Sequence, residues 1–123
     1  MIIEIDFNSD EAIYLQLRNQ IILGIATNTY REGDALPSVR ALAEEIGINM
    51  HTVNKAYSLL RQEGYVKVDR RKGAVIAIDE TREEHLSQIR EVLAPIVLEA
   101  VCRNISREEL HKMLDEIYDK YRL

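Results

Sequence analysis

Residues 36–64 decide the fold, and they read LPSVRALAEEIGINMHTVNKAYSLLRQEG. Apolar side chains recur twice in this stretch at the i, i+3, i+4, i+7 spacing of an amphipathic helix, first at Val39, Leu42, Ala43 and Ile46 and again at Val53, Ala56, Tyr57 and Leu60. Gly47 separates the two runs, because glycine takes the left-handed conformation that ends a helix without a steric penalty. Ser38 and Asn49 stand where the helices would begin, and both are good N-caps. Two short helices joined by a glycine turn predict a helix-turn-helix unit over about residues 39–58.

The flanking sequence predicts a helix before this unit and a hairpin after it. Ser9 and Asp10 are N-cap candidates for a first helix that runs to about Thr27. After Gly64, residues 65–69 alternate like a half-buried strand, and residues 74–78 read as a second strand across a basic turn. We therefore expect a mainly α fold with a small β-hairpin wing, a winged helix-turn-helix domain over residues 9–79 with its wing at 65–78.

Residues 80–123 predict a separate tail of two helices. One runs from Thr81 to about Cys102, with Pro95 inside it expected to bend the helix. The other begins at a capping box, Ser106 followed three residues later by Glu109. Two such helices cannot enclose a core alone, so their apolar faces need cover from the rest of the chain or from a second copy. We favour a dimerisation tail, with an interface of Leu86, Ile89, Leu93, Ile96, Val97, Leu110, Leu114 and Ile117.

Charge and composition narrow the function. The 123 residues are 46% apolar and 30% charged, which is typical of a compact globular protein. The net charge is −5, yet residues 49–73 carry six basic and two acidic side chains, a local charge of +4 on the third helix and the wing. Such a basic footprint favours DNA. No apolar run is long enough for a membrane helix, the first residues lack a basic signal-peptide region, and Cys102 is the single cysteine, so we expect a cytoplasmic protein associated with the nucleoid through DNA.

The outward face of the third helix carries the candidate chemistry. It is predicted to present hydrogen-bonding side chains of moderate length, which suit base edges and phosphates, namely His51, Asn54, Lys55, Ser58 and Gln62. An ordinary solvated helix face would look similar. A winged-helix module for protein contacts, the second alternative, predicts an apolar or acidic face instead.

Catalysis and metal sensing are a third alternative. The sequence has no glycine-rich phosphate loop, paired-histidine motif or nucleophile elbow, so we expect no enzyme and no cofactor. His85, Cys102 and His111 would have to converge to hold a transition metal. Two surface histidines and a small buried thiol are the simpler interpretation, and no metal site is expected.

Residues 12–77 resemble the GntR-type winged helix-turn-helix domain of bacterial transcription regulators. The matching segments are residues 13–17 (IYLQL), 33–43 (GDALPSVRALA), 46–49 (IGIN), Thr52-Val53, Ala56-Tyr57 with Leu60, Glu63-Gly64 and Lys72-Gly73. The short two-helix tail resembles that of the YtrA-like subfamily, in which it serves dimerisation.

This resemblance implies a set of DNA-binding positions: Ser38, Arg40, Asn49, Met50, His51, Thr52, Asn54, Lys55, Arg70, Arg71, Lys72 and Gly73. Tyr14 is interpreted as a core residue rather than a phosphate contact. Met50 departs from the pattern, because many family members place arginine there to read guanine. The base preference at that position is therefore open.

The resemblance also implies a function. We expect a sequence-specific transcriptional repressor that binds an inverted-repeat operator as a homodimer, with recognition helices about 34 Å apart. Control of a transporter operon is implied by the subfamily. The expected partners are double-stranded operator DNA and a second copy of the chain, without a membrane, and the existence of a small-molecule effector is left open.

Overall fold

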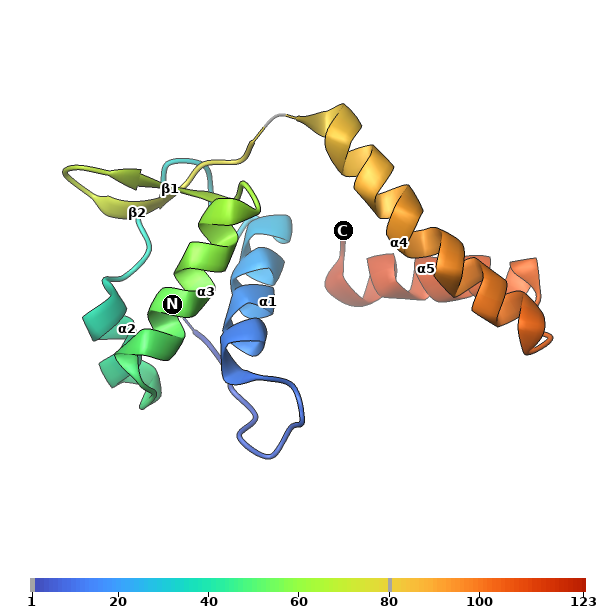
Figure 1. Cartoon of the computed structure of the whole chain (residues 1–123), viewed down its shortest axis with the longest axis horizontal. Helices are drawn as coiled ribbons and strands as arrows, with labels where there is room; N and C mark the ends of the chain where they lie inside the picture. Colours follow the sequence, from blue (N-terminus) through green and yellow to red (C-terminus); the bar gives the residue numbers. More distant parts are fainter. Residues whose placement is uncertain (1, 80) are drawn as a thin grey trace. The chain divides into compact units, whose positions relative to one another are not determined.

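The computed structural model describes residues 2–79 and 81–123 (Figure 1). Its elements in chain order are α1 (Ile13–Ala26), α2 (Val39–Ile46), α3 (Met50–Gln62), β1 (Val66–Asp69), β2 (Gly73–Ile76), α4 (Arg82–Cys102) and α5 (Arg107–Tyr121). The chain divides into two compact units, one ending at Asp79 and one formed by the residues that follow it. The predicted class, mainly α with a small β-hairpin, is confirmed.

The core of the first unit lies between its three helices. α1 packs against α3, and α3 packs against α2. The side chains predicted to face inward from α3 are all buried, as are Leu42 and Ala43 of α2, while Val39 and Ile46 at its two ends are half-buried. The largest fully buried side chains of the core are Leu17, Ile21, Leu42, Val53, Leu60 and Ile76.

The wing is shorter than the sequence predicts, and the segment before α2 pairs with one of its strands. β1 pairs antiparallel with β2 in the register Val66↔Ile76 to Asp69↔Gly73. The segment before α2 also bonds to β2, because Leu36 N–H donates to the Ala74 carbonyl and Ile76 N–H donates to the Asp34 carbonyl, both at 2.8 Å. These bonds attach the wing to the start of the helix-turn-helix unit.

The predicted alternation of the first wing strand is wrong at Val68. Val66 is buried, but Val68 is 64% exposed although it lies on the same side of the strand. Only the end of the hairpin nearest the helices reaches the core. Beyond that end no helix or strand of the described residues covers Val68, so period-2 alternation does not bury it.

The predicted start of the first helix is also wrong. α1 begins at Ile13, and its N-cap residue Ala12 makes no side-chain capping bond. Ser9 instead accepts a bond from Glu11 N–H at 3.1 Å, because serine side chains readily bond to the backbone two residues ahead and favour turns.

A buried glutamine holds the segment that precedes α1. The Gln16 side chain accepts from Asp6 N–H at 2.8 Å and donates to the carbonyls of Asp6 at 3.0 Å and Glu11 at 2.9 Å. Its burial is therefore matched by hydrogen bonds. Ile3 and Ile5, in the held segment, pack against the core.

The C-terminal end of α1 is shaped by a buried glycine. Gly24 accepts backbone bonds from Thr29 N–H at 2.8 Å and Tyr30 N–H at 3.0 Å. These bonds bring the Tyr30 ring against the helix, where a Cβ on Gly24 would lie 2.1 Å from Cε2. The close approach requires the absence of a side chain at Gly24.

The second unit consists of α4 and α5. The predicted capping box is confirmed, since Ser106 Oγ accepts from Glu109 N–H at 3.1 Å and Glu109 Oε2 accepts from Ser106 N–H at 2.7 Å. Pro95 lies inside α4. Cys102 is exposed, so its interpretation as a buried thiol is wrong, because the single chain leaves most of α4 uncovered.

Candidate nucleic-acid interface

The turn between α2 and α3 has the geometry that the sequence predicts. Gly47 ends α2 at φ 81°, in the left-handed region. The Asn49 side chain then accepts from His51 N–H at 2.7 Å and caps α3. The predicted cap of α3 and the predicted glycine turn are both confirmed. Together the cap and the turn orient α3 relative to α2.

α3 exposes most of the side chains expected on its outer face. His51, Asn54, Lys55 and Gln62 are exposed, whereas Ser58 is half-buried. Met50 is 44% exposed at the first position of the helix, and Thr52 is half-buried. The exposed side chains form a polar ridge with an apolar methionine at its N-terminal end.

A buried tyrosine joins the start of α2 to α3. Tyr57 Oη donates to the Pro37 carbonyl at 2.8 Å, and burial raises the pKa of the Tyr57 phenol. The phenol is therefore neutral at physiological pH and remains a donor. Next to Pro37, Ser38 Oγ caps α2 by accepting from Ala41 N–H at 3.1 Å, and Arg40 is exposed in the first turn. The hydrogen bond from Tyr57 to Pro37 holds Ser38 and Arg40 beside α3.

The tip of the wing is built by one aspartate. Asp69 Oδ1 accepts from Arg71 N–H at 2.7 Å and from Lys72 N–H at 3.0 Å, and these two bonds lower the pKa of the Asp69 carboxyl. Gly73 closes the turn at φ 78°. The side chains of Arg70, Arg71 and Lys72 are all exposed at the tip. Asp69 therefore fixes the backbone of the turn from which the three adjacent cations project.

Lys55 makes a contact that the sequence did not predict. Its Nζ lies 4.1 Å from the centroid of the Tyr14 ring on α1. Tyr14 is half-buried, so it both packs against the core and offers a ring face to the lysine. The two residues are 41 positions apart in the sequence, so no local pattern indicates this pair.

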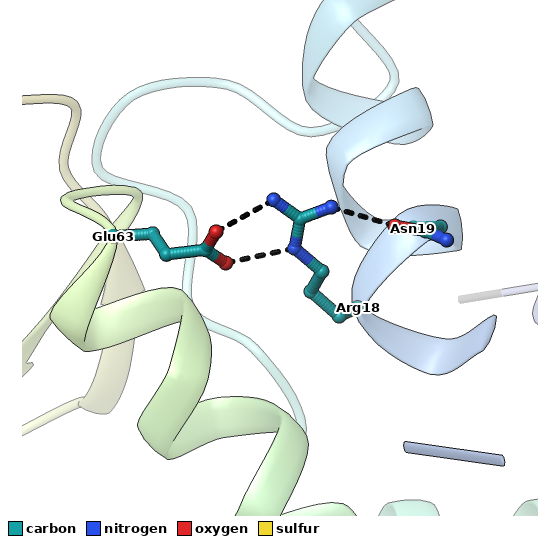
Figure 2. A network of polar contacts seen from close by, with 3 residues as sticks. All are labelled: Arg18, Asn19 and Glu63. Carbon is teal, nitrogen blue, oxygen red and sulfur yellow. Dashed lines mark hydrogen bonds and ion pairs between the residues drawn. The ribbon is translucent and has the colours of Figure 1, made fainter. Parts of the chain in front are cut away.

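A bidentate ion pair joins α1 to the end of α3, as Figure 2 shows. Arg18 Nε and Nη2 donate to the two carboxylate oxygens of Glu63, each at 2.7 Å, and Nη1 donates to Asn19 Oδ1 at 2.7 Å. The bond to Glu63 raises the pKa of the Arg18 guanidinium. The pair fixes the point where α3 ends and the wing begins. The sequence analysis gave Glu63 no partner and included it only in the Glu63-Gly64 match to the family pattern.

The tail presents a broad apolar surface in the single chain. Of the eight side chains predicted for dimerisation, Leu86 and Leu110 are half-buried and the other six are 41–54% exposed. Among the described tail residues only Ala100 is buried. Several large apolar side chains exposed on the same two helices are typical of an interaction site.

The three residues that were weighed as an alternative metal site do not gather. Within residues 2–79 and 81–123, no group of three or more His, Cys, Asp or Glu side chains is placed to hold a metal ion, so His85, Cys102 and His111 do not converge. In the same residues no helix is both long and apolar enough to cross a bilayer.

Comparison with known proteins agrees with this geometry. The chain matches the family model described as bacterial regulatory proteins, gntR family, over residues 10–76. It is 34% identical over 118 residues to the HTH-type transcriptional repressor YtrA of Bacillus subtilis, an alignment that covers 94% of this chain and 91% of that protein.

Two solved structures extend the likeness to the whole chain. The transcriptional antiterminator from Listeria monocytogenes EGD-e superposes with a TM-score of 0.86 at 28% identity, over 98% of this chain and 92% of that one. YtrA from Sulfolobus acidocaldarius, a GntR-family transcription factor, superposes with a TM-score of 0.59 at 36% identity, over 98% of this chain and 100% of that one.

The family assignment follows from these matches together. The family model covers more than half of the chain, and the YtrA repressor aligns over nearly all of it. The resemblance to the YtrA-like subfamily is thereby confirmed, and the relatives are named as regulators rather than as enzymes. The chain belongs to the gntR family of bacterial regulatory proteins and is a DNA-binding transcriptional regulator.

Proposed function

We propose that this regulator binds an inverted-repeat operator as a homodimer and represses transcription. The observation that carries the proposal is the apolar surface of α4 and α5, where six predicted interface side chains are 41–54% exposed. A second copy is the occupant that suits a surface of this kind, because twofold symmetry lets one apolar face cover another. Residues 80–123 are then the dimerisation tail and residues 9–79 the DNA-binding domain.

The DNA surface would combine three elements of the first unit. α3 enters the major groove with Asn49, Met50, His51, Thr52, Asn54 and Lys55. Arg40 and Ser38 approach from the first turn of α2, where a serine hydroxyl can still donate while its oxygen caps the helix. The wing residues Arg70, Arg71, Lys72 and Gly73 contact the backbone or the minor groove.

Oligomeric state tests the tail. The variant Leu93→Glu places a carboxylate in the apolar surface and should convert a dimer into a monomer in light scattering after size exclusion. Gln88→Glu adds the same group at an exposed polar position of α4 and is the matched control, which should remain dimeric. A wild-type chain that is monomeric at micromolar concentration contradicts the proposal.

Selection from a random duplex library at near-physiological salt tests the operator. The expected product is an inverted repeat with half-sites about one helical turn apart. Arg40→Ala should weaken binding to that operator by about 1–3 kcal/mol if the arginine reads a base. Equal binding by Arg40→Ala and wild type would overturn the assignment of Arg40, and the absence of any enriched repeat would overturn the operator model.

The regulated genes follow from the selected repeat. The relative that aligns over 94% of this chain is named as a repressor, which supports the same sign of regulation here. We expect the repeat to lie in the promoter of a transporter operon, and a reporter driven by that promoter should be more active when the regulator is deleted. A reporter that falls in activity identifies an activator instead.

A further inference from the structure

Lys55 and Tyr14 bring a cation of the recognition helix onto the face of an aromatic ring of α1. The Lys55 Nζ lies 4.1 Å from the ring centroid, with the lysine exposed and the tyrosine half-buried. An ammonium within about 6 Å of a ring centroid is attracted by the negative face of the ring. The contact restrains a flexible side chain that would otherwise sample many directions in solvent.

The contact also sets the direction in which the ammonium lies. Asn54 and Lys55 are consecutive on α3, so their side chains leave the helix about 100° apart. Lys55 reaches toward α1, the helix that also supplies Arg18 to Glu63 near the other end of α3. The ammonium is therefore drawn to the α1 side of the exposed face.

The edge of a helix in the major groove meets different chemistry from its centre. Base edges form the floor of the groove, whereas phosphates line both rims. A compact ammonium is a point charge suited to phosphate, while a paired contact to a base favours a planar group such as the amide of Asn54. Both the position and the chemistry of Lys55 therefore match the rim.

We propose that Tyr14 is a positioning residue that holds Lys55 for a backbone phosphate, so that Lys55 supplies sequence-independent affinity and takes no part in base reading. The inference rests on the proposed function, because it takes α3 as the helix that enters the groove. Tyr14 acts through its ring face, and its hydroxyl makes no contact with DNA.

Salt dependence tests the role of Lys55. Lys55→Gln should make the slope of log K against log salt shallower by about 1, and should weaken binding to the operator and to a random duplex by the same factor. Lys112→Gln removes the same charge from an exposed lysine of α5 and is the matched control, with an unchanged slope. An unchanged slope in Lys55→Gln, or an altered base preference in the duplex selection, would overturn the inference.

Two substitutions test Tyr14. Tyr14→Leu should weaken DNA binding by about two- to fivefold, whereas Tyr14→Phe keeps the ring face and should bind like wild type. In the Lys55→Gln background, Tyr14→Leu should cause no further loss, which a general structural role would not predict. Tyr14→Phe binding as weakly as Tyr14→Leu would show that the hydroxyl acts instead, and would reject the positioning role.

A measurement without DNA covers the case in which Tyr14→Leu does not fold. The Lys55 Hε protons should be shifted upfield by the ring in the NMR spectrum of the free protein, and the shift should persist in Tyr14→Phe. Its absence from the wild-type spectrum would reject the contact.

Binding to a random duplex separates this inference from the operator model. A failed selection together with a shallower salt slope in Lys55→Gln rejects only the operator model. A recovered repeat together with an unchanged salt slope in Lys55→Gln rejects only the role of Lys55.

Discussion

Gly24→Ala should destabilise this protein, although alanine is the better helix former. Gly24 is buried inside α1, and a Cβ there would lie 2.1 Å from Tyr30 Cε2 and 2.3 Å from Cδ2. Tyr30 cannot shift as a whole, because its N–H donates to the Gly24 carbonyl at 3.0 Å. The ring must therefore rotate out of its contact with the core.

The magnitude follows from two opposing effects. Replacing glycine by alanine in a helix interior is worth about 1 kcal/mol in favour of folding. Forcing extra volume into a packed site costs about 1–3 kcal/mol, and two ring carbons well inside van der Waals contact place Gly24 in the upper part of that range. We expect a net loss of about 1–2 kcal/mol, and each kcal/mol lowers Tm by about 4–8 °C in a domain of 60–100 residues.

A double-mutant cycle with Tyr30→Ala isolates the steric cost. Without the ring, Gly24→Ala keeps only the helix preference, so it should raise the stability of the Tyr30→Ala background by up to about 1 kcal/mol. The assay is urea unfolding of the full chain, followed by circular dichroism at one fixed protein concentration, because the proposed dimer would make the apparent stability depend on concentration. A Gly24→Ala protein more stable than wild type would show that the Tyr30 ring does not oppose a side chain at this position.

Three further predictions concern polar contacts. Arg18→Met should lower stability by about 0.5–1 kcal/mol at low salt and by less at 1 M salt. The reason is that the Arg18 and Glu63 side chains remain 25% and 34% exposed to solvent, so salt screens their attraction. Thermal melts at the two salt levels check this, and an effect that does not change with salt contradicts it. Because the pKa of Asp69 is lowered, its stabilisation of the wing is complete above the ordinary carboxyl pKa and is lost as pH falls through the lowered value. The two backbone amides bonded to Asp69 should therefore titrate together in NMR spectra, below the usual aspartate range. A transition at or above that range would disprove the turn. Asn49→Ala should lower stability by about 1 kcal/mol in urea unfolding and Asn49→Ser should restore most of it; unchanged stability with weakened DNA binding would identify a contact rather than a cap.

The helix-turn-helix unit was predictable because its determinants are local. The caps at Ser38 and Asn49 act over two or three residues, and the left-handed turn needs only Gly47. Apolar spacing along α3 is likewise read within a window of eight residues. The prediction of where α1 begins was wrong for a related reason. Ser9 can cap a helix or close a turn, and its local sequence does not distinguish the two.

Sequence alone predicts the order of the elements, the glycine turn, the capping box of α5 and the local positive charge of the third helix and wing. All of these follow from propensity, periodicity and charge within short windows of the chain. Four features emerge only from tertiary packing: Arg18 meets Glu63, Lys55 lies on Tyr14, the segment before α2 extends the wing, and Val68 is uncovered. Each of these depends on how residues far apart in sequence pack together, and packing selects one set of neighbours that no local pattern specifies.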